Sequence, residues 1–243
     1  LLLLVVAHKL WGWHPALAAA VTLPFLIVDF IFFAATSLKI FQGGWFPLLI
    51  GASAFFLMST WKAGRDILSH RLNAETMPLK LFVNSIGAGA GQTVPGTAVF
   101  MTGSHHYVPH ALLHNMKHNK IIHERNVLLT LITRDVPFVD DNERVIIERI
   151  AHEFYLVTAA YGFKEQPDVP ALFALCQAQG LIFDMMDTSF FLARQTLLPS
   201  SRPGMAIWRE KLFSWMLRNA ESAMEFFRLP TNRVVELGSQ VEI

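Results

Sequence analysis

The chain has 243 residues, of which 53% are hydrophobic and 16% are charged, and its mean hydropathy is +0.38. An ordinary soluble domain carries about 25% charged residues, so this balance argues against a chain that is soluble throughout. The formal net charge of +1 excludes the broad basic surface that a nucleic-acid partner needs, and the single cysteine, Cys176, excludes an intrachain disulfide and favours a reducing compartment.

Charged side chains are distributed unevenly along the chain. The first 61 residues contain only Lys9, Asp29 and Lys39, whereas charges occur every few positions afterwards. This change predicts three parts, which are a transmembrane segment over residues 1–61, a juxtamembrane helix and linker over residues 62–94, and a cytosolic α/β domain over residues 95–243.

Two apolar runs in the first part are long enough to be membrane helices. Residues 15–37 hold one charge and would cross about 30 Å of hydrocarbon at 1.5 Å per residue. Residues 45–61 form a shorter second span, with Trp45 and Trp61 at its ends, where interfacial aromatic residues are found. We expect a helical hairpin with a short, Gly-bearing link, preceded by the tail of an earlier span at residues 1–6.

The basic residues predict which side of the membrane the rest of the chain occupies. Lys62, Arg65 and Arg71 follow the second run, whereas only Lys39 lies in the link. Because cytoplasmic flanks retain Lys and Arg, the long C-terminal part is predicted to be cytosolic. The chain also opens on Leu1 inside an apolar run without an initiator methionine, so we expect it to be a piece of a longer protein.

Asp29 is the candidate functional residue of the membrane segment. An ionisable group near mid-bilayer costs at least about 2.5 kcal/mol on insertion scales and usually faces the interior of a helix bundle. Two interpretations follow: Asp29 has a functional role, or it forms a hydrogen bond to a neighbouring helix or lies closer to an interface.

The cytosolic part alternates between strand and helix patterns. It follows a Gly-rich stretch, Gly87–Gly91, that does not continue into the Gly-Lys-Ser/Thr of a phosphate-binding loop. Strands are expected at residues 97–102, 127–134, 144–151, 153–161, 189–194 and 233–237, and helices at 109–120, 169–179 and 205–220. Asp168 is placed to cap the second of these helices, and Gly180 follows its end. This pattern predicts an α/β domain and leaves its strand order open.

Residues that could carry chemistry are few. His110, His114 and His118 recur at every fourth position and would share one helix face, which is a spacing that can bind a transition metal. No Glu directly follows the first histidine and no Cys ligand is near, so we favour a polar helix face over a metal site or a pH sensor. Cys176 has no adjacent His and no Gly-x-Ser-x-Gly elbow is present, so we expect no enzyme and no cofactor.

Several segments of the chain are distinctive. They are Gly43-Gly44-Trp45-Phe46-Pro47-Leu48, Thr60-Trp61-Lys62, Val94-Pro95-Gly96-Thr97-Ala98-Val99, His114 to Lys120 with His123-Glu124-Arg125, and Asn232 to Ile243. These segments resemble the KUP/HAK/KT family of potassium transporters, and the resemblance covers essentially the whole chain. His105-His106 and the short Gly87–Gly91 stretch depart from the family pattern.

The resemblance implies a bacterial inner-membrane protein that takes up potassium, as a potassium/proton symporter with the inverted-repeat, broken-helix architecture of amino-acid/polyamine-type transporters. Residues 15–37 and 45–61 would be its last two spans. Asp29 matches an Asp of the family's penultimate span, whereas the potassium-coordinating residues lie on earlier helices and are missing here. A nucleotide-type regulator of the cytosolic domain and a homodimer are further expectations, beside the lipid bilayer and the two ions as partners.

Two alternatives remain at this point. The first is a membrane-tethered module whose α/β domain binds a regulatory ligand without any transport. The second is a soluble α/β enzyme in which both apolar runs are buried helices, although core helices seldom run for 20 or so residues without polar relief.

Overall fold

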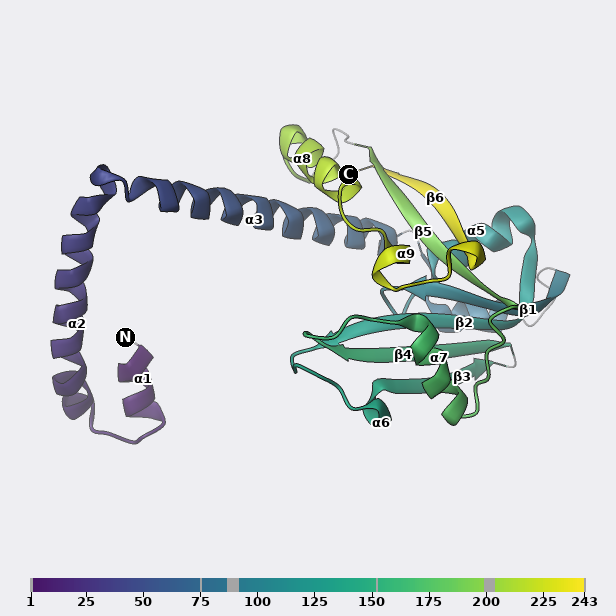
Figure 1. Cartoon of the computed structure of the whole chain (residues 1–243), viewed down its shortest axis with the longest axis horizontal. Helices are drawn as coiled ribbons and strands as arrows, with labels where there is room; N and C mark the ends of the chain where they lie inside the picture. Colours follow the sequence, from purple (N-terminus) through teal and green to yellow (C-terminus); the bar gives the residue numbers. More distant parts are fainter. Residues whose placement is uncertain (1, 75, 87–91, 152, 199–203, 243) are drawn as a thin grey trace. The chain divides into compact units, whose positions relative to one another are not determined.

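The computed structural model describes residues 2–74, 76–86, 92–151, 153–198 and 204–242. The chain forms two compact units, one over residues 1–59 and one over residues 60–243 (Figure 1). The first unit is helical. The second is an α/β unit, as the sequence predicted, and its sheet has helices on both faces.

The first unit holds long apolar helices. Its elements are α1 (Leu2–Lys9), α2 (Pro15–Ser37), the 3-10 helix η1 (Leu38–Gln42) and the beginning of α3 (Trp45–Ala74). The helix predicted over residues 15–37 is confirmed with the same bounds, and the second begins at Trp45 as predicted. The stretches 15–42 and 45–74 are long and apolar enough to cross a membrane, with mean hydropathies of 2.3 and 1.2. Large side chains of α2 such as Phe30 and Phe33 are exposed, which suits a helix solvated by lipid.

Small residues let the helices of this unit approach closely. Ala7 of α1 and Ala18 of α2 are buried where the two helices meet, and Thr22 donates a hydrogen bond to the Ala18 carbonyl at 2.5 Å. In the link, Gly43 has φ +118° and ends η1, and a Cβ on Gly44 would lie 2.9 Å from the Lys39 carbonyl oxygen. Both glycines are therefore needed to turn the chain between α2 and α3.

The second unit contains one six-stranded sheet in the order β3-β4-β2-β1-β5-β6. The described strands are parallel except β3, which pairs antiparallel with β4 at the edge. The strands are β1 (Gln92–Thr102), β2 (Ile121–Arg134), β3 (Val145–Ala151), β4 (Phe154–Gly162), β5 (Thr188–Leu198) and β6 (Val234–Glu242). All six predicted strands are confirmed, and β1, β2, β5 and β6 are longer than expected.

Helices cover both faces of this sheet because strand residues alternate between them. On one face, α4 (Leu79–Ile86) and α5 (His110–Asn119) pack on residues such as Phe100 and Leu128. On the other, α7 (Val169–Ala178) packs on Val99 and Leu129. The remaining elements are α6 (Asp141–Arg144), α8 (Ile207–Arg218), α9 (Ala223–Phe226) and η2 (Thr231–Arg233).

Caps and turns explain several element ends. The Asp168 carboxylate accepts a hydrogen bond from the Ala171 N–H at 2.9 Å, which confirms the predicted cap of α7. Gly180 follows that helix with φ +87°. Helix α4 was not predicted, because its eight residues were assigned to the linker. The Gly87–Gly91 stretch and Ile243 lie outside the described residues.

The second half of α3 belongs to the second unit and packs against α8. The predicted continuation beyond Trp61 is the same helix, which runs on to Ala74. Leu68 is buried beside Phe213 of α8, Leu197 of β5 and Val241 of β6, and the Trp61 and Phe213 rings meet edge to face at 5.6 Å.

Replacing Gly64 with alanine should destabilise this packing, because an added Cβ would overlap the buried Phe213 ring. We expect a loss of about 1–3 kcal/mol, the usual cost of overpacking. Thermal unfolding of the purified chain in detergent measures it. Gly51→Ala is the matched control, since nothing lies within 4 Å of its added Cβ and alanine favours a helix. An unchanged transition for Gly64→Ala would contradict the packing.

Candidate functional site

Asp29 lies in the middle of the first apolar stretch, as the fifteenth of the 28 residues from Pro15 to Gln42. Its neighbours along α2 are apolar, and its side chain is exposed on the helix. Among the residues that the structure describes, Asp29 forms no hydrogen bond or ion pair. A lone carboxylate at this depth needs water, a proton or a partner on another helix.

Hydroxyl groups in the apolar stretches, such as those of Thr36 and Ser53, differ from Asp29 because they bond to their own helices. Thr36 donates to the Phe32 carbonyl at 2.8 Å, and Ser53 donates to the Leu49 carbonyl at 2.8 Å. Such bonds satisfy a hydroxyl in a membrane without any external partner. Pro24 lies inside α2, where its ring removes one backbone hydrogen bond five residues before Asp29. Asp29 is thus the polar side chain of α2 that its own helix does not satisfy.

The three histidines lie on α5 as predicted but do not converge on one point. The His110 Nε2 atom is 3.2 Å from the Leu72 carbonyl oxygen, whereas the rings of His114 and His118 stack at 5.7 Å. Burial, and then the positive charges of His118, His110 and Lys117, lower the pKa of His114. In the described ranges, no group of three or more His, Cys, Asp or Glu side chains is arranged to hold a metal ion.

A second candidate site lies where the order of the strands reverses. The chain passes from β1 through α5 to β2 on one side, and later through α7 to β5 on the other side of β1. Because α5 and α7 cover opposite faces, the carboxyl end of β1 beside β5 is a topological switch point. Open α/β sheets bind ligands in the crevice outside such a point.

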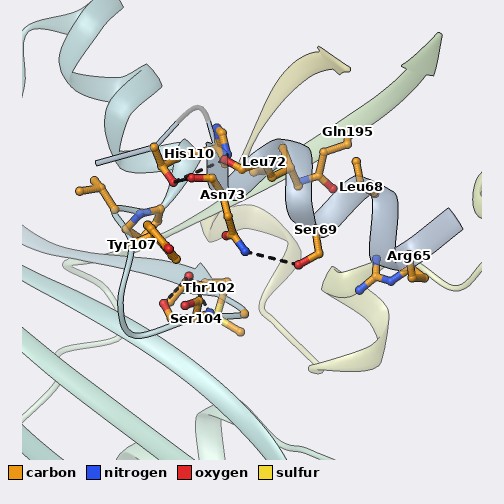
Figure 2. A pocket seen from close by; sticks show the side chains of 16 residues that line it. Arg65, Leu68, Ser69, Leu72, Asn73, Thr102, Ser104, Tyr107, His110 and Gln195 are labelled. Carbon is orange, nitrogen blue, oxygen red and sulfur yellow. Dashed lines mark hydrogen bonds between the residues drawn. The ribbon is translucent and has the colours of Figure 1, made fainter. Parts of the chain in front are cut away.

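A cavity of about 300 Å³ occupies this position. Its walls come from the second half of α3 and Thr76 shortly after it, the end of β1 and the loop that follows, the start of α5 at His110, and the middle of β5. Figure 2 shows Ser69 and Asn73 of α3 on one side, and Thr102, Ser104 and Tyr107 on the other. The Thr102 hydroxyl donates to the Ser104 carbonyl at 3.0 Å and so holds the loop in place.

Basic side chains line this cavity, and acidic side chains do not. Among the described residues that line it are Arg65 and His110, but no Asp or Glu. The Arg65 guanidinium, the Tyr107 hydroxyl and the Gln195 amide form no hydrogen bond or ion pair within the described part of the chain. The cavity therefore offers polar groups that other side chains of the fold do not occupy.

The ion pairs around Arg144 and the Cys176 thiol serve structure rather than chemistry. Arg144 joins Glu165 at 2.8 Å and Asp141 at 2.9 Å, and the Arg144 hydrogen bond lowers the pKa of Glu165 to about 2. Burial raises the pKa of the Cys176 thiol to about 11, so that this side chain is an inert part of the core beneath α7.

Sequence reasoning identified Asp29 and the histidines but missed the cavity. Arg65 was used only to orient the membrane segment, and Thr102, Ser104, Tyr107 and Gln195 were not singled out. One signal was available, since Thr102-Gly103-Ser104 lies at the end of a buried strand and before a helix. Only the strand order shows that this particular strand end is the switch point.

Comparison with known proteins covers both units. Residues 95–243 match the family described as "K+ potassium transporter C-terminal domain", and residues 1–66 match "K+ potassium transporter integral membrane domain". Similar curated proteins include "Probable potassium transport system protein Kup 2" of Rhizorhabdus wittichii, 58% identical over 242 residues, and "Probable potassium transport system protein Kup" of Myxococcus xanthus, 52% identical over 239 residues.

These alignments cover 100% and 98% of this chain, but 37% of each relative, so the chain spans little more than a third of their length. The "Probable potassium transport system protein Kup" of Azoarcus sp. is 54% identical over 239 residues, which are 98% of this chain and 38% of that protein. No solved structure matches the chain.

Proposed function

Because this chain belongs to the K+ potassium transporter family, a family of transporters and not of enzymes, we propose that the protein of which it forms part carries potassium ions across the cytoplasmic membrane. The observation that carries the proposal is the match of both units to the two domains of that family. In this proposal residues 1–61 supply the last membrane helices, and the part from residue 95 onward is a cytosolic domain. The basic residues Lys62, Arg65 and Arg71 support that orientation.

We further propose that transport is coupled to protons and that Asp29 is the membrane acid of this chain. Its place at mid-span, without a partner on its own helix, supports a carboxylate that faces the other helices of an inverted-repeat bundle. The potassium-coordinating residues then lie on earlier helices. This chain alone should not transport, because two spans cannot enclose a site between two repeats.

Growth of an uptake-deficient bacterium on limiting potassium tests the proposal. We expect the whole protein to restore growth and the present chain alone to fail. Membrane fractionation and immunoblotting must show that both are inserted in similar amounts. A whole protein that is well inserted but restores no growth would overturn the proposed transport.

Ligand binding by the α/β unit is the second function that the geometry favours, with a nucleotide-type regulator as one expected ligand and a homodimer as one expected assembly. The cavity at the switch point is the supporting observation. The test uses a version of the protein that is truncated before Gln92 and therefore lacks the entire sheet. If this version restores growth but no longer responds to conditions that regulate the parent, the unit is a regulator; if growth depends on it entirely, it is part of the transport machinery.

A further inference from the structure

The cavity at the switch point has the chemistry of an anion site. Its described lining brings together one arginine, one histidine and several neutral donors, with no carboxylate to repel a negative charge. Arg65 is exposed on α3 and has no counter-ion in the described part of the second unit. An unpaired guanidinium beside a polar cavity is suited to two parallel hydrogen bonds with a carboxylate or phosphate.

The first turn of α5 adds to this chemistry. The N-cap of α5 is Pro109, which forms no capping hydrogen bond through its side chain, and both Pro109 and His110 line the cavity. The early N–H groups of a helix have no partners within it, and they carry the positive end of its dipole. The cavity, the free arginine and this helix end therefore favour the same charge on a ligand.

The other residues that line the cavity indicate what the uncharged part of the ligand should be. Leu68, Leu72 and Met101 are apolar, whereas the Tyr107 hydroxyl and the Gln195 amide are polar and half-buried. At about 300 Å³ the cavity is larger than an inorganic anion requires and lies at the lower end of the range for small-molecule sites, about 300–1,000 Å³. A small organic molecule with one charged group and a body of mixed polarity fits these walls.

We propose that this cavity binds a small organic anion whose phosphate or carboxylate group is recognised by Arg65 and the first turn of α5. The inference rests on the second function proposed above and specifies the class of its ligand. Arg65, Leu68 and Leu72 all belong to α3, the helix whose first half forms the second apolar stretch. A ligand in the cavity thus contacts the helix that is proposed to cross the membrane last, which gives the site a direct connection to transport.

Calorimetric titration of the full chain in detergent tests the assignment. The probes are adenosine 5′-monophosphate, citrate and inorganic phosphate, with uncharged adenosine as the neutral counterpart of the first. We expect at least one organic anion to bind with an affinity that falls as salt is raised, and adenosine to bind at least ten-fold more weakly than its monophosphate. Arg65→Ala should weaken binding of the anion about ten-fold or more.

Lys62→Ala is the matched control, because it removes a basic residue from the same exposed helix, three positions away and outside the cavity. It should leave binding unchanged. Gln195→Leu tests contacts with the uncharged part of the ligand. It should weaken binding of the organic anion but not binding of inorganic phosphate. Equal binding of adenosine and its monophosphate, equal loss in Lys62→Ala and Arg65→Ala, or no binding of any anion at millimolar concentration would each overturn the assignment.

This measurement needs no transport activity. If the growth experiment fails while binding succeeds, the potassium proposal falls and the anion site stands. If a neutral molecule occupies the cavity instead, the ligand class is wrong, but the regulatory role of the unit remains open to its own test.

Discussion

Replacement of Asp29 by asparagine in the whole protein is expected to lower the rate of potassium uptake about ten-fold or more, which corresponds to about 1.4 kcal/mol on the barrier. Asparagine has a similar size and keeps hydrogen-bonding groups, but it cannot carry a negative charge or exchange a proton. The neutral side chain should also insert more easily, because a carboxylate at mid-bilayer costs at least about 2.5 kcal/mol. A loss of uptake with normal insertion would therefore report on the carboxylate itself.

Initial uptake rates, divided by the amount of protein in the membrane, measure this effect. Asp29→Glu retains the acid and should restore part of the rate. Ser53→Ala is the control in the other apolar stretch, since the Ser53 hydroxyl bonds only to the carbonyl of Leu49 in its own helix. It should change uptake little. A parental rate in Asp29→Asn would show that the carboxylate has no part in transport.

The second large effect that we expect is a loss of stability when an ion pair of Arg144 is broken. The Arg144 side chain is 11% exposed and that of Glu165 is 16% exposed. The second oxygen of Glu165 also accepts hydrogen bonds from the Gly162 N–H at 2.7 Å and the Val139 N–H at 3.1 Å. Glu165→Gln should destabilise the second unit by about 3 kcal/mol, the lower end of the range for breaking a buried pair, because Arg144 loses its most buried counter-charge.

Thermal unfolding in detergent measures this loss, and Glu143→Gln is its control. Glu143 also pairs with an arginine, at 3.3 Å to Arg134, but its side chain is 71% exposed. An exposed pair of this kind contributes less than about 1 kcal/mol. Equal effects of the two substitutions would contradict the difference in burial.

The stability of the second unit should also depend on pH through Glu165. Because the pKa of Glu165 falls from 4.5 to about 2 on folding, its stabilising contribution is complete above pH 4.5 and is lost as the pH falls towards 2. The parent chain should therefore lose stability through this window. In Glu165→Gln the same window should show a smaller slope, since the substituted side chain does not titrate.

Local patterns were sufficient to predict most of the elements. The helix over residues 15–37 has a proline at its start and a long apolar run, and the cap at Asp168 depends on residues only three positions apart. The strands β1, β2 and β5 were found because buried parallel strands carry continuous apolar and β-branched runs. The early part of β1 was missed, because Pro95-Gly96 looks like a turn.

In the structure Gly96 has φ +99° and lies where the register between β1 and β2 shifts, so the strand continues through a bulge. The site could not be predicted in the same way. Asp29 was chosen as a candidate because a single charge in an apolar run is visible in the sequence. The cavity joins Arg65 to Gln195 across 130 positions, and only the arrangement of α3, β1 and β5 brings them together.

The packing of α3 also determines how long one side of this helix stays uncovered during synthesis. Leu68 is covered by Val241, and Arg71 donates a hydrogen bond to the carbonyl of Glu242, 171 residues later in the chain. The second half of α3 must therefore wait, with its apolar side uncovered, until these distant partners have been synthesised. Correct folding of the second unit depends on protection of that surface during this interval.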